Sequence, residues 1–201
     1  MDREVRELKE TFEGLRIPEA HIAAWSYGAE TALGFAVRHP KMVRSLALIE
    51  PPAIWVLQSR GPLSAEMVRS QEKLRSMGPG PISEDQLAWF AHFAGFVPPG
   101  VDPRKVPPWP SWMEHRQSLR TQDAAYRHEG EMGRVPAFPR PVLLFKGEGS
   151  SDFLNEIIGI LGEEFPKGTV QKLPGGHALH VISMERFMEI YLDFVSRAKE
   201  S

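Results

Sequence analysis

Short runs of apolar residues, each about the length of one strand, constrain the fold of this chain more than any other feature. Three of them are HIAAW at 21–25, SLALI at 45–49 and PVLLF at 141–145, and residues 169–173 form a fourth candidate strand. A strand that is apolar on both faces has to be covered on both faces, which is typical of parallel sheets flanked by helices. The sequence therefore predicts an α/β fold with a mostly parallel sheet of about four strands.

Helical patterns separate and follow these strands. Residues 5–15 and 184–198 are amphipathic, with apolar positions three and four apart, and residues 29–37 and 153–161 also have the pattern or composition of helices. Strands that alternate with helices along the chain favour parallel pairing, because each helix can carry the chain back to the start of the next strand.

The middle of the chain, residues 53–137, has a different character. Proline is frequent there, with six prolines between positions 98 and 110, and proline interrupts regular structure. Short helical patterns occupy 64–77, 83–93 and 112–126. We expect a helical, Pro- and Trp-rich cap over residues 53–137, inserted into a core made of residues 1–52 and 138–201.

Aromatic residues are interleaved with proline and glycine in this cap, and two interpretations of them stay open. In one, they pack the cap's own small core; in the other, some of them line a substrate pocket. The residues concerned are Trp89, Phe90, Phe93, Phe96, Trp109 and Trp112.

Composition argues against several classes of function. The net charge of −2, with acids and bases interspersed, disfavours a nucleic-acid surface and favours a neutral or ester-like small-molecule substrate. The chain has no cysteine, which excludes disulfides and thiolate metal sites. It also lacks a metalloprotease motif, a phosphate-binding loop and a dinucleotide fingerprint, so we expect neither a metal nor a cofactor. A charged start, MDREVRELKE, and the lack of an apolar run of ~20 residues predict a cytoplasmic protein with no membrane contact.

A serine directly after the first predicted strand is the candidate nucleophile. Ser26 lies in the stretch AWSYGAE, between the strand at 21–25 and a helix. In a nucleophile elbow, a sharp strand-to-helix turn projects the serine oxygen out of the sheet, and small residues two positions away on either side relieve crowding. Ala24 and Gly28 occupy those positions, and the backbone N–H of Tyr27 is placed to donate to an oxyanion. On its own, a serine at such a junction is more often a helix cap.

The sequence around Ser26 is more specific. Residues 21–52, HIAAWSYGAETALGFAVRHPKMVRSLALIEPP, resemble the α/β-hydrolase superfamily, whose pattern is a strand, small-x-Ser-x-Gly, a helix, His-Pro and a second strand. PVLLFKGEG at 141–149 resembles the strand before the acid-bearing loop of that family. VQKLPGGHALH at 170–180 resembles the strand and loop that carry its catalytic histidine. The resemblance covers roughly residues 1–52 and 138–198, and it implies the order Ser, acid, His along the chain.

The resemblance implies that His177 is the general base of a catalytic triad. It follows Gly175 and Gly176, which allow the backbone to turn tightly and present the imidazole. His180, three residues further on, is the alternative base.

The acid of the triad stays open. Glu50 is favoured, since some α/β-hydrolases place the acid after the strand that follows the nucleophile helix, and Glu50 ends the strand at 45–49. The usual position, counted from Gly147, is occupied by Ser150, and Asp152 is the second candidate. Glu148, no acid at all, or a purely structural role for Glu50 complete the alternatives.

The resemblance also implies that part of the fold is missing from this sequence. The family has eight strands with the nucleophile on the fifth, whereas a single predicted helix precedes the strand at 21–25. We therefore expect a truncated fold in which that strand forms an open sheet edge, without the loop that donates the second oxyanion N–H. The start could be misassigned or the chain a fragment, the edge could be covered by a second copy or another polypeptide, or the remaining sheet could close on itself.

The predicted function is that of a serine hydrolase acting on an ester, thioester or similar bond of a moderately apolar small molecule through an acyl-enzyme. The alternative is a catalytically silent α/β-hydrolase remnant that acts only by association. The exposed sheet edge predicts a homo-oligomer.

Overall fold

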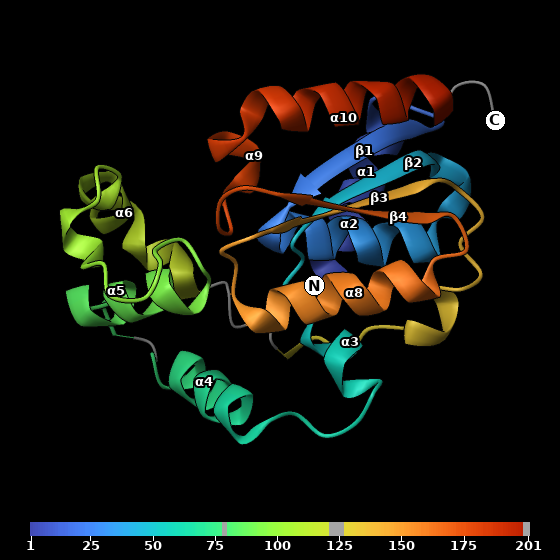
Figure 1. The fold of residues 1–201 in the computed structure, drawn as a ribbon. Coiled ribbons are helices and arrows are strands. Elements are labelled where there is room, and N and C mark those ends of the chain that lie inside the picture. The colour runs from blue at the N-terminus through green and yellow to red at the C-terminus, as the bar shows by residue number, and fades with distance from the viewer. Residues whose placement is uncertain (78–79, 121–126, 199–201) are drawn as a thin grey trace.

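The centre of the molecule is a parallel sheet of four strands (Figure 1). The computed structural model describes residues 1–77, 80–120 and 127–198. The strands lie in the order β1-β2-β3-β4, and every neighbouring pair is parallel. They are β1 Ala20–Trp25, β2 Val43–Ile49, β3 Val142–Gly147 and β4 Gly168–Leu173. The predicted α/β fold with about four parallel strands is confirmed.

Helices follow each strand and fill the long connection between β2 and β3. The α-helices are α1 Asp2–Gly14, α2 Ser26–Arg38, α3 Ile54–Gln58, α4 Ala65–Ser76, α5 Glu84–Phe93, α6 Trp109–His115, α8 Asp152–Glu164, α9 Leu179–Ile182 and α10 Met184–Ala198. Short 3-10 helices lie at Pro40–Met42, Pro103–Lys105, Arg116–Ser118 and Met132–Arg134.

The helix predicted at 112–126 is wrong in its bounds. It begins earlier, at Trp109, because Pro110 falls in the first turn, where its missing N–H costs no hydrogen bond. It ends at His115 and passes into a 3-10 turn at Arg116–Ser118, after which residues 119–120 are helical again. Residues 121–126 of the predicted helix lie outside the described residues.

Both faces of the sheet are covered, as the apolar strands require. Along β2, Leu46 and Leu48 belong to the larger core cluster, while Ala47 and Ile49 belong to a second cluster with Phe187 of α10. Figure 1 shows α10 on one face and α2 and α8 on the other. The alternation follows from the period of two in a strand, which sends successive side chains to opposite faces.

β1 is an edge strand, since β2 is the one strand that pairs with it within the described ranges. Its residues are mostly half-buried and Ala23 is exposed, whereas β2 is buried at every position except Arg44. Ser26 therefore follows the carboxyl end of an edge strand. The expectation that a second copy of the chain covers this edge stays a prediction.

The connection between β2 and β3 lies at the carboxyl ends of the strands and beside α8. α5 and α6 stand beyond these strand ends in Figure 1, and α3 packs against α8. In parallel sheets, the loops at this end form the usual ligand site. The division into a core at 1–52 and 138–201 and a cap at 53–137 stays a prediction.

Candidate active site

Ser26 is the turning point between β1 and α2. The strand ends at Trp25 and the helix begins at Ser26, whose φ of 54° lies in the left-handed region. Non-glycine residues there are strained by about 1–3 kcal/mol, and such strain concentrates at functional sites. The crowding expected around Gly28 is absent, because a Cβ built there would meet no heavy atom within 4 Å.

Three of the predicted site residues form one hydrogen-bonded chain. Ser26 Oγ lies 2.8 Å from His177 Nε2, and His177 Nδ1 lies 2.8 Å from Glu50 Oε2. Glu50 and His177 are 0% and 2% exposed. With the Nδ1–H donating to the carboxylate, Nε2 is left to accept the serine proton. Ser26 and His177, which are 151 positions apart in the sequence, thus meet at the carboxyl end of the sheet.

Glu50 is held on both sides. Its second oxygen, Oε1, accepts a 2.7 Å hydrogen bond from the backbone N–H of Gly147, at the end of β3. The backbone at Glu50 has a φ of 45°, the same uncommon region as Ser26. A buried carboxylate that accepts bonds from a backbone N–H and from an imidazole is fixed in orientation.

The other candidate acids lie elsewhere. Asp152 is exposed at the first turn of α8 and lines a separate cavity of about 670 Å³ with Arg60 and Phe153. Glu148 is exposed in the turn after β3. Across the described ranges, neither carboxylate bonds to His177, so the geometry favours Glu50 as the partner of the histidine.

Trp25 holds the loop that carries His177. Its indole Nε1–H donates a 2.7 Å hydrogen bond to the backbone carbonyl of His177, and the two rings lie 5.4 Å apart. Phe96 approaches the same imidazole edge-on, with ring centroids 4.9 Å apart at 85°. The sequence analysis assigned no role to Trp25 or the Gly147 N–H and did not predict the contact of Phe96 with His177, because each of these contacts spans a long sequence separation.

His180, the alternative base, lies in α9. Its ring packs on Trp25 with centroids 4.7 Å apart. Among the described residues, the imidazole that bonds to Ser26 is that of His177 and not that of His180. Burial, with a smaller contribution from His177, lowers the pKa of His180. It is placed as a packing neighbour of the candidate triad.

A cavity of about 360 Å³ opens onto Ser26. Its lining is mainly apolar and comes from the elbow and from the connection between β2 and β3. Phe90, Phe96 and Trp112 line it, whereas Trp109 is buried in the core. Trp89 and Phe93 stack on one another with centroids 5.0 Å apart. The aromatic residues thus divide between the cavity lining and the core, and Phe93 also stacks on Phe153 of α8, outside residues 53–137.

Tyr27 begins the first turn of α2 next to Ser26. The first backbone N–H groups of a helix have no partner inside it, and the dipole favours negative charge there. The Tyr27 hydroxyl donates a 2.9 Å hydrogen bond to Glu4 of α1, and burial together with that carboxylate raises the pKa of Tyr27. The side chain ties α1 to the elbow, and Tyr27 is among the residues that line the cavity at Ser26.

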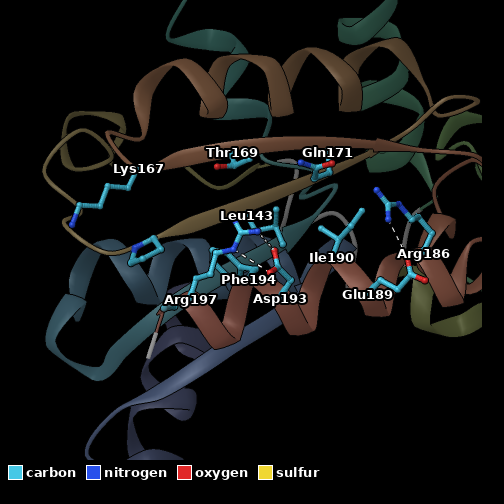
Figure 2. Close-up of a pocket in the computed structure, with 12 residues that line it drawn as sticks. Leu143, Lys167, Thr169, Gln171, Arg186, Glu189, Ile190, Asp193, Phe194 and Arg197 are labelled. Atoms are coloured by element: carbon cyan, nitrogen blue, oxygen red, sulfur yellow. Dashed lines mark hydrogen bonds and ion pairs between the residues drawn. The ribbon is translucent and has the colours of Figure 1, made fainter. Parts of the chain in front are cut away.

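A second groove, shown in Figure 2, contains none of the predicted site residues. It runs between α10 and the β3–β4 side of the sheet, with a volume of about 650 Å³. Its arginines are paired along the helix, Arg186 with Glu189 and Arg197 with Asp193.

Within the described ranges, His, Cys, Asp and Glu side chains form no cluster of three that could hold a metal ion. No described helix is both long enough and apolar enough to span a bilayer.

Solved structures share this fold. A hydrolase from Pseudomonas aeruginosa superposes with a TM-score of 0.76 over 95% of this chain and 70% of its own length, at 18% identity. An esterase from Exiguobacterium antarcticum gives 0.71 over 96% and 72%, at 17% identity. A bromoperoxidase from Bacillus anthracis gives 0.71 over 96% and 72%, also at 17% identity. At such identities the likeness shows the fold alone.

The family of the chain follows from comparing its sequence with models of protein families. No curated protein matches the chain. The model of the "Alpha/beta hydrolase family" matches residues 2–190, a range that includes Ser26, Glu50 and His177. The match covers most of the chain and agrees with the resemblance found in its motifs. The chain therefore belongs to the alpha/beta hydrolase family.

Proposed function

We propose that the chain is a serine hydrolase that cleaves an ester, thioester or similar bond through an acyl-enzyme, with Ser26, His177 and Glu50 as its catalytic triad. The observation that carries the proposal is the chain of two 2.8 Å hydrogen bonds from Ser26 through His177 to Glu50. A nucleophile, a base and an orienting carboxylate within hydrogen-bond reach are the geometric signature of this chemistry.

In the first half of the reaction, Ser26 Oγ attacks the carbonyl carbon of the substrate while its proton passes to His177 Nε2. Glu50 stabilises the imidazolium that forms and keeps Nδ1 protonated. The carbonyl π electrons move to the oxygen, and in this proposal the Tyr27 backbone N–H donates to that oxyanion. The bond to the leaving group then breaks, and the proton on Nε2 passes to the leaving oxygen or sulfur.

In the second half, water replaces the leaving group. His177 Nε2 takes a proton from water as its oxygen attacks the acyl carbon, and the tetrahedral intermediate collapses with return of the proton to Ser26 Oγ. The products are a carboxylic acid and the free enzyme. The mainly apolar lining of the Ser26 cavity supports a moderately apolar substrate.

Labelling by a fluorophosphonate probe tests the nucleophile. The probe phosphonylates an activated serine and loses fluoride, so we expect it to label the purified chain at Ser26 and to fail on Ser26→Ala. Ser111→Ala is the matched control, since Ser111 lines the same cavity and should leave labelling unchanged. Labelling that survives Ser26→Ala, or that never occurs on the folded chain, would refute the proposal.

A 4-nitrophenyl ester tests the acyl-enzyme. An initial burst of nitrophenol, equal in amount to the active chain and followed by slower turnover, is the kinetic mark of a covalent intermediate. A catalytically silent protein gives neither the burst nor the turnover.

A further inference from the structure

The cavity at Ser26 contains one permanent charge among its described lining residues, the guanidinium of Arg116. The apolar part of the lining includes Leu87, Phe90 and Leu119. A cation beside apolar side chains in a cavity is costly unless it has a partner, because burial removes solvent from the charge. An anion that paired with Arg116 would offset this cost.

Arg116 is held in place by backbone carbonyls. Its Nε–H donates a 2.9 Å hydrogen bond to the carbonyl of Ile82, and an Nη1–H donates to the carbonyl of Met113, at the end of α6. These bonds use two of the five N–H groups of the guanidinium. The side chain is half-buried, and these two bonds fix the orientation of its remaining donors.

Within residues 1–77, 80–120 and 127–198, no carboxylate lies within ion-pair distance of Arg116. The nearby acids Glu84 and Asp85 pair with Arg104 instead. The groove of Figure 2 provides a contrast, because Arg186 and Arg197 both have carboxylate partners on α10. Arg116 thus combines a fixed position, a place in the cavity of Ser26 and an uncompensated charge.

We propose that the substrate has an apolar segment ending in an anionic group, with a carboxylate as the simplest case, and that Arg116 pairs with that anion. The assignment rests on the proposed function, since it names the substrate class of the same serine. The apolar segment contacts the aromatic lining, and the anion receives charge-assisted hydrogen bonds from a guanidinium that is already oriented. Arg116 is therefore a specificity-determining residue.

Binding of two six-carbon probes, hexanoate and 1-hexanol, tests the proposal without requiring turnover. Trp25 and Trp112 line the cavity, so tryptophan fluorescence reports occupancy. At neutral pH hexanoate is ionised, and we expect its Kd to be at least about tenfold lower than that of 1-hexanol, as for a hydrogen bond to a charged group. Equal or weaker binding of hexanoate would overturn the proposal.

Two variants locate the effect. Arg116→Met keeps the length of the side chain and removes the charge, so the preference for hexanoate should disappear while 1-hexanol binds as before. Arg120→Met is the matched control, because Arg120 also donates to a backbone carbonyl, that of Gly80, but lies outside the cavity lining. A preference retained in Arg116→Met, or lost equally in Arg120→Met, contradicts the assignment.

Salt dependence gives a readout on the unsubstituted chain, in case Arg116→Met fails to fold. Raising the salt from about 0.05 M to about 1 M screens a partly exposed ion pair. The preference for hexanoate should fall severalfold, and a preference unaffected by salt argues against pairing with a cation.

Failure of this proposal is distinguishable from failure of the proposed function. If the fluorophosphonate labels Ser26 but hexanoate is not preferred, the proposed anion site is wrong and the proposed hydrolase function stands. If hexanoate is preferred but the fluorophosphonate does not label Ser26, the proposed hydrolase function is wrong and the cavity is an anion-binding site.

Discussion

The indole N–H of Trp25 donates a 2.7 Å hydrogen bond to the backbone carbonyl of His177, so the residue before the candidate nucleophile directly restrains the candidate base. The same indole packs against the imidazoles of His177 and His180 and against Phe96. Ser26 and His177 are therefore aligned by a side chain of the elbow itself, in addition to their own hydrogen bond.

Trp25→Phe should lower kcat with little change in KM. Phenylalanine keeps most of the ring packing but has no N–H, so the loop carrying His177 loses one anchor. We expect kcat to fall by about tenfold, the upper end of the effect of one hydrogen bond, while Tm changes little. Trp89→Phe is the control, since Trp89 stacks on Phe93 away from the triad. Equal kcat values for Trp25→Phe and the parent would show that the bond does not position the base.

Glu50→Gln and Asp152→Asn separate the two candidate acids. Glu50 bonds to His177 Nδ1, and its amide counterpart favours the wrong tautomer of the imidazole, which in a triad lowers kcat by about 10³–10⁴-fold. Asp152 is exposed on α8, so Asp152→Asn should retain kcat within about twofold. Steady-state kinetics with a 4-nitrophenyl ester measure both. A large loss in Asp152→Asn and a small one in Glu50→Gln would reverse the assignment.

Gly176→Ala should misplace His177. A Cβ at Gly176 would lie 2.2 Å from the carbonyl oxygen of Gly95, a backbone atom that also accepts the His177 N–H at 2.9 Å. The clash displaces one of the two loops, so kcat/KM should fall and the free energy of unfolding should drop by about 1–3 kcal/mol. At Gly149 the nearest atom to a built Cβ is 3.6 Å away, an ordinary contact, and Gly149→Ala serves as control. Chemical denaturation and ester kinetics check both variants, and indistinguishable behaviour of the two would contradict the crowding.

Glu30 makes the stability of the fold depend on pH. It is 1% exposed on α2, where Oε1 accepts a 3.2 Å hydrogen bond from the Trp55 indole, and Oε2 has no hydrogen-bond partner in the described structure. Burial raises the pKa of Glu30 well above its usual value. A carboxyl whose pKa is higher in the folded state favours folding fully below its unfolded pKa of about 4.3, and this contribution is lost as pH rises through the folded pKa.

Glu30→Gln should therefore remove a pH-dependent loss of stability. Between the unfolded and folded pKa values, the parent should lose about 1.4 kcal/mol per pH unit relative to the variant. Urea denaturation at several pH values from about 5 to about 8 measures the difference in slope. Glu10→Gln, on the exposed side of α1, is the control and should follow the parent. Parallel stability curves for the parent and Glu30→Gln would rule out a neutral Glu30 in the folded state.

The sequence by itself determined the order of strands and helices and the position of the elbow at Ser26. These features are local: an apolar run of five residues favours a strand covered on both faces, and a small-x-Ser-x-Gly pattern between strand and helix is complete within a few positions. The place of His177 in a tight loop after a strand was also predictable, because the LPGG turn before it is contiguous in the chain.

Only the tertiary structure decided which carboxylate meets the histidine and which aromatic residues face the cavity. Glu50 and Asp152 both follow apolar strands, and their surroundings in the sequence do not reveal that one is buried against Gly147 and the other is exposed on α8. Phe96 reaches His177 while Trp89 stacks within its own segment. These outcomes depend on contacts across long stretches of chain, set by strand register and loop packing, which no local periodicity encodes.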